Sequence, residues 1–228
     1  MKIAAIVPAY NEEQRIGRVL SIISAMPQVD EIVVVNDGSS DRTAAQVPRN
    51  NGIRAVDLRR NIGKGGAMHV GANQTDADVL VFLDADLVGL QAQHVLALLR
   101  PVVNGDADMS VGVFRGGRYW TDLWQHLVPY ISGQRAIRRN LFLSIPCVSR
   151  SRFGVEAALT QHARATRWRV KLVPLAGMTH IMKEEKYGFF PGLWSRARMY
   201  AEIGACLLAE HCRNGVRSIN GKSLRQTG

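Results

Sequence analysis

Two aspartates, Asp84 and Asp86, directly follow the short apolar run at residues 79–83. The length of this run and its Val, Leu and Phe content predict a buried β-strand. Carboxylates at the end of such a strand lie at the edge where open α/β sheets bind ligands. Hard divalent cations prefer one or two carboxylates together with the phosphate oxygens of a substrate. The pair therefore predicts a metal ion that holds a nucleotide diphosphate, although a solvated loop with two acids shows the same spacing.

Two further apolar runs also end in polar residues. Tyr10 and Glu12 follow the run at residues 3–7, and Asp37 follows the run at 31–35. Tyr10 can stack on a base, Glu12 can accept a hydrogen bond from a base edge or ribose, and Asp37 can accept one from a uracil N–H or a sugar hydroxyl. The alternatives are acids in the first turn of a helix and an Asx turn. Three strands that each end in a carboxylate would direct these groups into one crevice.

A glycine-rich segment, N-I-G-K-G-G at 61–66, contains Lys64. Its backbone N–H groups can approach a diphosphate, and Lys64 can add a positive charge. The order of residues is not that of a P-loop, and the segment does not follow the first strand as a dinucleotide fingerprint does. It predicts a different kind of phosphate contact.

The elements that position these residues alternate along the front half of the chain. Predicted strands are 3–7, 31–35, 53–58, 79–83, 108–114 and 169–173, and predicted helices are 11–24, 65–74, 91–99 (ended by Pro101), 121–129, 155–163 and 195–211. This order predicts an α/β fold with a mainly parallel, Rossmann-like sheet, helices on both faces and a mixed C-terminal part. We expect one domain over 1–228, with a front half at 1–114, a back half at 115–212 and a flexible basic tail at 213–228.

The 228 residues carry a net charge of +10, which is unevenly placed. Residues 1–114 hold 10 Lys/Arg against 13 Asp/Glu, and residues 115–228 hold 19 against 6. The basic back half predicts an anionic partner: a phosphorylated acceptor, an anionic membrane surface or nucleic acid. No apolar stretch approaches the roughly 20 residues that span a bilayer. We expect a cytoplasmic protein, with peripheral contact at the inner membrane face left open.

Four segments in order resemble family 2 glycosyltransferases of the GT-A fold: V-P-A-Y-N-E-E (7–13), V-N-D-G-S-S-D-R-T (35–43), N-I-G-K-G-G-A (61–67) and F-L-D-A-D-L (82–87). The resemblance implies that the front half at 1–114 binds a nucleotide sugar, that the back half at 115–212 binds the acceptor, and that the cofactor is a divalent metal, Mn²⁺ or Mg²⁺. The implied nucleotide-binding residues are Pro8, Ala9, Tyr10, Glu12, Asp37, Lys64, Asp84 and Ala85.

The back half extends the resemblance. Residues 132–139 are similar to the S-G-x-R-A segment of polyprenyl-phosphate glycosyltransferases, which makes Arg135 and Arg139 candidates for an anionic acceptor, with a solvated basic helix face as the alternative. Residues 153–156 are similar to a Y-G-V-E segment of soluble relatives, where the Glu lies beside the transferred sugar. The implied metal ligands are Asp84, Asp86 and His180, and the implied catalytic residues are Asp86, Glu156, Lys64 and Arg135.

The resulting hypothesis is a metal-dependent transfer of a hexose from a UDP- or GDP-sugar to an acceptor, phosphorylated or of the polyprenyl-phosphate kind. Residues 183–194 are interpreted as a lid over the donor or a membrane-facing segment, with a core-packing helix as the alternative. A homodimer is compatible with this hypothesis. Two other classes stay open: a non-catalytic nucleotide-sugar-binding module and a nucleic-acid-binding protein, the latter without a zinc or helix-turn-helix signature.

Overall fold

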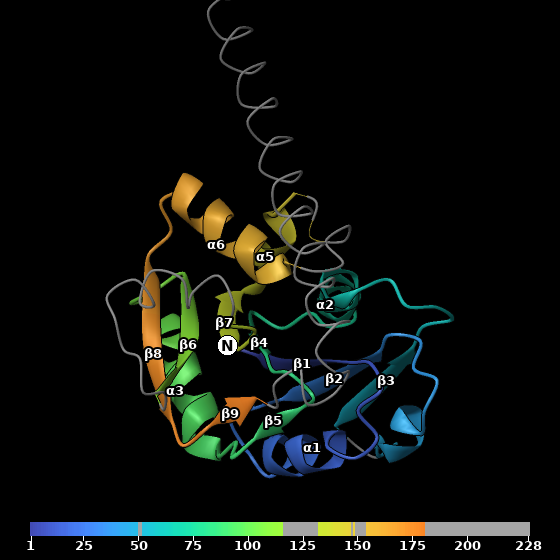
Figure 1. Cartoon of the computed structure of the whole chain (residues 1–228). Coiled ribbons are helices and arrows are strands. Elements are labelled where there is room, and N and C mark those ends of the chain that lie inside the picture. Colours follow the sequence, from blue (N-terminus) through green and yellow to red (C-terminus); the bar gives the residue numbers. More distant parts are fainter. Residues whose placement is uncertain (50–51, 116–131, 147, 149–153, 181–228) are drawn as a thin grey trace, which may run out of the picture.

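The apolar runs form one seven-stranded sheet in the order β3-β2-β1-β4-β7-β6-β8, beside a small two-stranded sheet of β5 and β9 (Figure 1). The structure is a computed structural model that describes residues 1–49, 52–115, 132–146, 148 and 154–180. The strands are β1 Ile3–Ala9, β2 Glu31–Asn36, β3 Ile53–Asp57, β4 Val79–Phe82, β5 Leu87–Val88, β6 Met109–Arg115, β7 Arg135–Arg138, β8 Val170–Ala176 and β9 Thr179–His180. The helices are α1 Ile16–Ser24, the 3₁₀ turn η1 Thr43–Gln46, α2 Lys64–Asn73, α3 Ala92–Val103, α5 Arg139–Ser144 and α6 Val155–Ala165.

The direction of chain winding reverses between β1 and β4. The chain passes from β1 through β2 to β3 on one side and then returns to β4 on the other side, and all these pairs are parallel. A reversal of this kind opens a crevice outside the carboxyl ends of the two strands. β7 runs antiparallel to both of its neighbours, β4 and β6, while β6 and β8 are parallel. The predicted mainly parallel sheet with a mixed C-terminal part is therefore confirmed.

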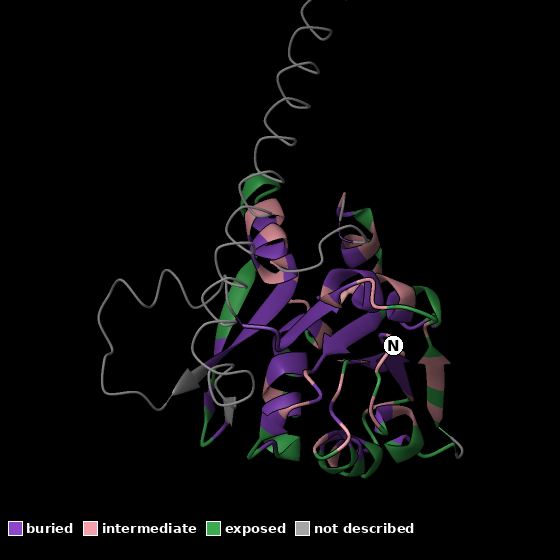
Figure 2. Ribbon diagram, turned by 45° about the vertical axis from the view of Figure 1, so that its right-hand side comes forward, coloured by how far each residue is buried: buried purple, intermediate pink, exposed green. Residues whose placement is uncertain are grey.

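Helices cover both faces of the sheet, as predicted, and each face has its own apolar core (Figure 2). On one face, α1 and α3 pack on the strands through side chains such as Leu20 and Leu98. On the other face, α2, α5 and α6 do the same through Met68, Phe142 and Leu159. The central strands are buried on both sides, which explains their nearly continuous apolar runs.

Two predicted helix boundaries are wrong. α1 begins at Ile16 rather than at Asn11, because Asn11 has a φ of 56° and its side-chain oxygen accepts a hydrogen bond from Ser40 N at 2.9 Å. This contact holds the segment as a loop beside the end of β2. α3 continues through Pro101 to Val103, since Pro101 and Val102 are buried and their packing offsets the missing N–H.

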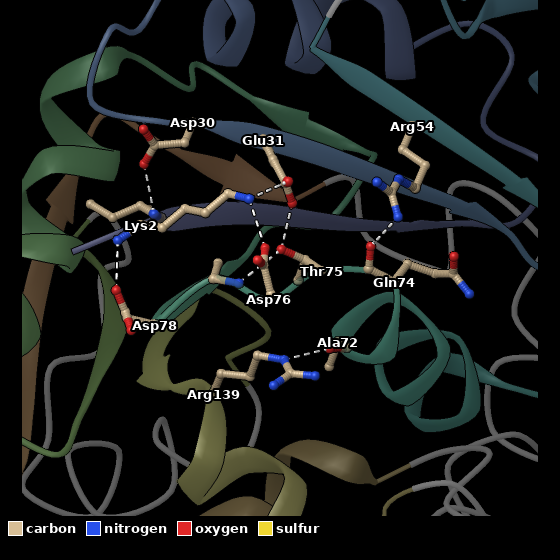
Figure 3. A network of polar contacts seen from close by, with 12 residues as sticks. Lys2, Asp30, Glu31, Arg54, Ala72, Gln74, Thr75, Asp76, Asp78 and Arg139 are labelled. Carbon is tan, nitrogen blue, oxygen red and sulfur yellow. Dashed lines mark hydrogen bonds and ion pairs between the residues drawn. The ribbon is translucent and has the colours of Figure 1, made fainter.

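A polar network joins the strand starts at the opposite edge of the sheet (Figure 3). Lys2 Nζ lies 2.7 Å from both Glu31 Oε1 and Asp76 Oδ1, and its backbone N donates to Asp78 Oδ2 at 2.7 Å. These groups are half-exposed or exposed, so each contributes little to stability by itself. Together they tie the starts of β1, β2 and β4 at a distance from the crevice.

Within the described residues, no helix has the length and apolar character needed to cross a bilayer. The helices predicted at 121–129 and 195–211, the lid or membrane segment at 183–194 and the basic tail lie outside the described residues.

Candidate active site

The carboxyl ends of β1, β2 and β4 bring the predicted residues to one edge of the sheet. Asp37 follows β2 and donates its backbone N–H to Ala9 O, in the last residue of β1, at 2.8 Å. Asp84 follows β4 after one residue, and β4 pairs with β1 in register from Ile3 to Ile6. The parallel pairing thus brings three strand ends together, as the motif spacing predicted.

Lys64 connects this edge to the back half of the chain. Its Nζ atom lies 2.6 Å from Asp84 Oδ1 and 2.6 Å from Glu156 Oε1, and all three side chains are mostly buried. Gln134 Nε2 donates to the other oxygen of Asp84 at 2.9 Å. Each oxygen of the Asp84 carboxylate therefore already accepts from an N–H donor. We name Lys64, Asp84 and Glu156 the ion triad.

Gly133 leaves room for the ion triad. A Cβ atom built on Gly133 would lie 2.5 Å from Asp84 Oδ2 and would also collide with Lys64 Nζ. Real Cβ atoms essentially never make contacts that short, and the atoms met are the far ends of the Lys64 and Asp84 side chains, so a larger residue would displace these two side chains. The glycine of the S-G-x-R-A segment therefore allows the ion pair between Lys64 and Asp84 to form where it does.

Asp37 holds the loop that presents Lys64. Its two carboxylate oxygens accept hydrogen bonds from Ile62 N at 2.7 Å and Gly63 N at 2.9 Å, and the side chain is buried. Gly63 has a φ of 91°, which allows the sharp entry into α2 one residue before Lys64. The structure thus gives Asp37 a structural role in addition to the predicted contact with a nucleoside, which stays a prediction.

The end of β1 carries the other predicted nucleoside-binding residues. Tyr10 is 42% exposed at the mouth of the crevice, as a residue that stacks on a base must be. Glu12 is largely buried; its backbone N donates to Thr43 Oγ1 at 2.8 Å, and its carboxylate lies 3.5 Å from Arg15 Nη1. Pro8 is half-buried and pairs in register with Val35. Their contacts with a nucleoside remain predictions.

Arg135 is fully buried within β7 rather than exposed on a basic helix face, so that alternative interpretation is wrong. Its Nε donates to Ser132 O, its Nη1 to Thr160 Oγ1 and its Nη2 to Glu156 O, each at 3.0 Å. These partners belong to the protein, and the expected contact with an acceptor stays a prediction.

Arg139 lies away from the ion triad. β7 is antiparallel to β4, with Arg135 opposite Phe82 at one end and Arg138 opposite Val79 at the other. Arg139 follows at the far end, where its Nε donates to Ala72 O at the end of α2, 2.9 Å away (Figure 3). The strand thus places the two predicted acceptor arginines at opposite edges of the sheet, roughly 13 Å apart along the chain direction.

Burial and charge set the protonation of the site. Burial alone would raise the pKa of Glu156, but the positive charges of Lys64 and Arg135 outweigh it and lower that pKa below its ordinary value. Burial likewise opposes the charge of Lys64, yet Asp84 and Glu156 raise its pKa. Burial lowers the pKa of Arg135 to about 10, against the opposing effect of Glu156 and Asp84. All three groups are therefore charged at neutral pH.

The predicted metal ligands Asp86 and His180 come from neighbouring elements. β5 follows Asp86 directly and pairs antiparallel with β9, with Leu87 opposite His180. A carboxylate and an imidazole are donors that suit Mg²⁺ or Mn²⁺ when phosphate oxygens complete the shell. Over the part of the chain that the structure describes, no three His, Cys, Asp or Glu side chains gather into a metal site. The donor chemistry of Asp86 and His180 thus fits a divalent cation, and their role as ligands stays a prediction.

Three features of the site were absent from the sequence prediction: the contact of Gln134 with Asp84, the steric role of Gly133, and the grip of Asp37 on the loop before Lys64. Only the glycine left a signal, since Gly133 belongs to the quoted S-G-x-R-A segment. The others depend on contacts between residues far apart along the chain.

Comparison with known proteins gives a consistent result. Residues 4–162 match the family model described as glycosyl transferase family 2. Undecaprenyl-phosphate 4-deoxy-4-formamido-L-arabinose transferase of Photorhabdus laumondii is 38% identical over 96 residues, which cover 38% of this chain and 29% of that protein. 4,4'-diaponeurosporenoate glycosyltransferase of Staphylococcus haemolyticus is 37% identical over 100 residues, which cover 41% of this chain and 26% of that protein. The matches thus span less than a third of the length of these curated relatives.

Solved structures are similar over more of the chain. Glucosyl-3-phosphoglycerate synthase from Mycobacterium tuberculosis, in complex with Mn²⁺, UDP and phosphoglyceric acid, superposes with a TM-score of 0.71 at 27% identity, covering 91% of this chain and 78% of that one. The same enzyme in complex with Mg²⁺ and UDP gives a TM-score of 0.70 at 26% identity, covering 91% and 78% of the two chains.

Proposed function

The chain belongs to glycosyl transferase family 2, and we propose that it transfers a hexose from a nucleotide sugar to a phosphorylated acceptor in a metal-dependent reaction. The observation that carries this proposal is the ion triad. Lys64 lies at the carboxyl edge of β1 and β4, where it meets Asp84 from the front half and Glu156 from the back half. A lysine at this position can donate hydrogen bonds both to a diphosphate and to the sugar attached to it.

The proposed donor is a UDP-sugar, with a GDP-sugar as the alternative. The similar mycobacterial enzyme was solved with UDP, and the exposed side chain of Tyr10 is accessible for stacking on a base. The residues proposed to bind the nucleotide are Pro8, Ala9, Tyr10, Glu12, Asp37, Lys64, Asp84 and Ala85. Asp84 is proposed to accept from the ribose as well, because its oxygens have further lone pairs.

Asp86 and His180 are the proposed metal ligands. The pairing of β5 with β9 brings the backbone of His180 beside Leu87, the residue after Asp86, and the similar solved structures hold Mn²⁺ or Mg²⁺ together with UDP. Asp84 is the weaker candidate for a ligand, since Lys64 already places a positive charge 2.6 Å from Oδ1. When bound, the cation would neutralise charge on the diphosphate as a Lewis acid.

In the transfer, the bond between the anomeric carbon and the diphosphate oxygen breaks, and its electron pair stays on that oxygen. A new bond forms between the same carbon and an acceptor oxygen. Lys64 donates to the departing diphosphate, whose negative charge grows as the bond breaks. Glu156, held as a carboxylate, accepts a hydrogen bond from a hydroxyl of the sugar or of the acceptor. A phosphate acceptor is already anionic and needs no strong base.

The proposed acceptor is a phosphorylated compound. Of the three kinds of acceptor named among the similar proteins, two are phosphorylated: undecaprenyl phosphate in the name of one relative and phosphoglyceric acid in the complex of the solved enzyme; the third, 4,4'-diaponeurosporenoate, is a carboxylate. The excess of positive charge in residues 115–228 favours either of the phosphorylated acceptors. A lipid phosphate would require the chain to work at a membrane surface, where the same basic half would favour anionic headgroups.

A thermal-shift panel of UDP, GDP, ADP and their sugars, with and without Mn²⁺, tests the donor and the metal together. We expect one nucleotide to raise the melting temperature by several degrees, and only when Mn²⁺ is present. Transfer of labelled hexose from the matching sugar nucleotide to 3-phosphoglycerate or to a short polyprenyl phosphate then tests the reaction. If no nucleotide changes the melting temperature and no label moves, the proposal is wrong.

A further inference from the structure

Among the described residues, Arg135 is the largest side chain that is fully buried. Burying a cation is costly unless its donors are satisfied, and here three of them point at oxygens 3.0 Å away. Two of the three acceptors, Glu156 O and Thr160 Oγ1, belong to the first turns of α6. An apolar side chain of similar volume would fill the same space without the free-energy cost of removing a charge from water. Packing alone therefore does not explain an arginine at this position.

The start of α6 has no capping side chain of its own. Its N-cap is Gly154, with a φ of 85° and no side-chain hydrogen bond to the first turn. Glu156 O accepts from two side chains, Arg135 Nη2 of β7 at 3.0 Å and Thr160 Oγ1 of the next turn of α6 at 2.8 Å. The backbone position of Glu156 is therefore held by β7.

The side chain of the same glutamate reaches Lys64. Its Oε1 atom lies 2.6 Å from Lys64 Nζ, across 92 positions of sequence. An error of about 1 Å in the position of a reacting group can lower the rate about a hundredfold. Glu156 thus contacts Arg135 through its backbone oxygen and Lys64 through its side chain.

We propose that Arg135 is a positioning residue that fixes the first turn of α6 on β7 so that Glu156 meets Lys64 at the reacting end of the crevice. Its planar guanidinium directs several donors at set angles, which a lysine ammonium cannot reproduce. The inference rests on the proposed function and adds to it the residue that sets the spacing between the two halves of the site.

A double-mutant cycle tests this coupling. We would measure kcat and the donor KM for Arg135→Met, Glu156→Gln and the double variant, with Arg135→Lys and Thr160→Val as milder versions. Val95→Ala, a core change in α3 away from the site, is the control for lost stability. All assays would be run at a temperature at which every variant is folded.

Arg135→Met is expected to lower kcat about 10- to 100-fold with little change in the donor KM. In the Glu156→Gln background the same substitution should lower kcat by less than about twofold, because the residue that it positions is already disabled. Arg135→Lys and Thr160→Val should fall between Arg135→Met and the unchanged chain. Equal effects of Arg135→Met in both backgrounds would overturn the proposal.

Crystal structures give a readout that does not depend on transfer. The contact between Lys64 Nζ and Glu156 Oε1 should be lost in Arg135→Met or Arg135→Lys and kept in Val95→Ala. If it is kept in the arginine variants, Arg135 does not position Glu156. An unchanged chain that binds no nucleotide and transfers no sugar would instead refute the proposed function, while the crystallographic comparison would still decide the role of Arg135.

Discussion

At the scale of single residues, Lys64 of the ion triad has two roles, one in stability and one proposed in catalysis. Lys64 neutralises two carboxylates that would otherwise repel each other, and it is proposed to stabilise the departing diphosphate. The first role concerns stability and the second concerns catalysis. The two roles can be measured separately. In a variant that lacks Lys64, removal of one carboxylate should restore part of the stability but should not restore catalysis.

Lys64→Met should lower the free energy of unfolding by about 1–3 kcal/mol, a value reduced for the partial exposure of the group. It should also lower kcat by about 100-fold or more. Adding Glu156→Gln removes one of the two carboxylate charges that Lys64 neutralises and should recover part of the stability but none of the activity. Urea unfolding and transfer assays on the unchanged chain and on these two variants check this, and recovery of activity in the double variant would contradict the catalytic role.

Gly133→Ala should disrupt the site by sterics alone. The added Cβ would meet Asp84 Oδ2 at 2.5 Å and collide with Lys64, so nucleotide binding and transfer should both fall at least about tenfold. Gly17→Ala is the matched control, since nothing lies within 4 Å of its added Cβ and it is on an exposed helix position. That control should raise the free energy of unfolding by about 0.5–1 kcal/mol and leave transfer intact.

At the scale of elements, the loop between β3 and α2 is held by a strand that is not its sequence neighbour. Asp37, after β2, binds the backbone of Ile62 and Gly63, so the entry of α2 has one position relative to the crevice. β7 acts similarly on α6. The two helices that carry Lys64 and Glu156 are thus each held by a side chain from, or just after, a strand of the sheet.

Asp37→Asn should weaken binding of UDP with Mn²⁺ by about tenfold, because an amide can accept only one of the two N–H groups and places its NH₂ against the other. Asp57→Asn is the control, because this half-exposed acid at the end of β3 contacts Asn36 and Arg49 rather than the loop. Isothermal titration calorimetry measures both affinities. Equal affinities for the two variants would show that the loop does not depend on Asp37.

At the scale of the whole molecule, several carboxylates have lowered pKa values in the folded chain: Glu31, Asp41, Asp76, Asp108 and Glu156. Each binds its proton less readily in the folded state than in the unfolded state. Its contribution to stability is therefore fully present above the unfolded pKa, near 4, and is lost as the pH falls through the folded pKa.

The free energy of unfolding should accordingly be flat with respect to these acids from about pH 5 to 7 and should fall steeply below about pH 4. Glu156→Gln removes one of these groups, so its curve should fall less steeply than that of the unchanged chain. Chemical denaturation between pH 3 and 7 measures both curves. Parallel curves would mean that the pKa of Glu156 is the same folded and unfolded.

The strands and helices of the front half could be predicted because the apolar period of each one is local. Residues 3–7, 31–35 and 79–83 form β1, β2 and β4, and their polar ends meet at one edge, as predicted. The boundaries at Asn11 and Pro101 could not be predicted, since a contact with Ser40 and the burial of Val102 decide them. The local pattern of apolar residues carries no information about this contact or this burial.

The amino-acid sequence by itself determined the fold class, the family and the set of charged residues at the strand ends, because motifs and apolar periods are carried by neighbours along the chain. Only the tertiary structure decided which of these charges meet. It paired Lys64 with Glu156, buried Arg135 beside them and directed Arg139 to the other edge. The physical reason is that β7 runs antiparallel to both β4 and β6. The direction of a strand within a sheet is set by its pairing with neighbouring strands. That direction decides whether the first or the last residues of the strand lie at the site.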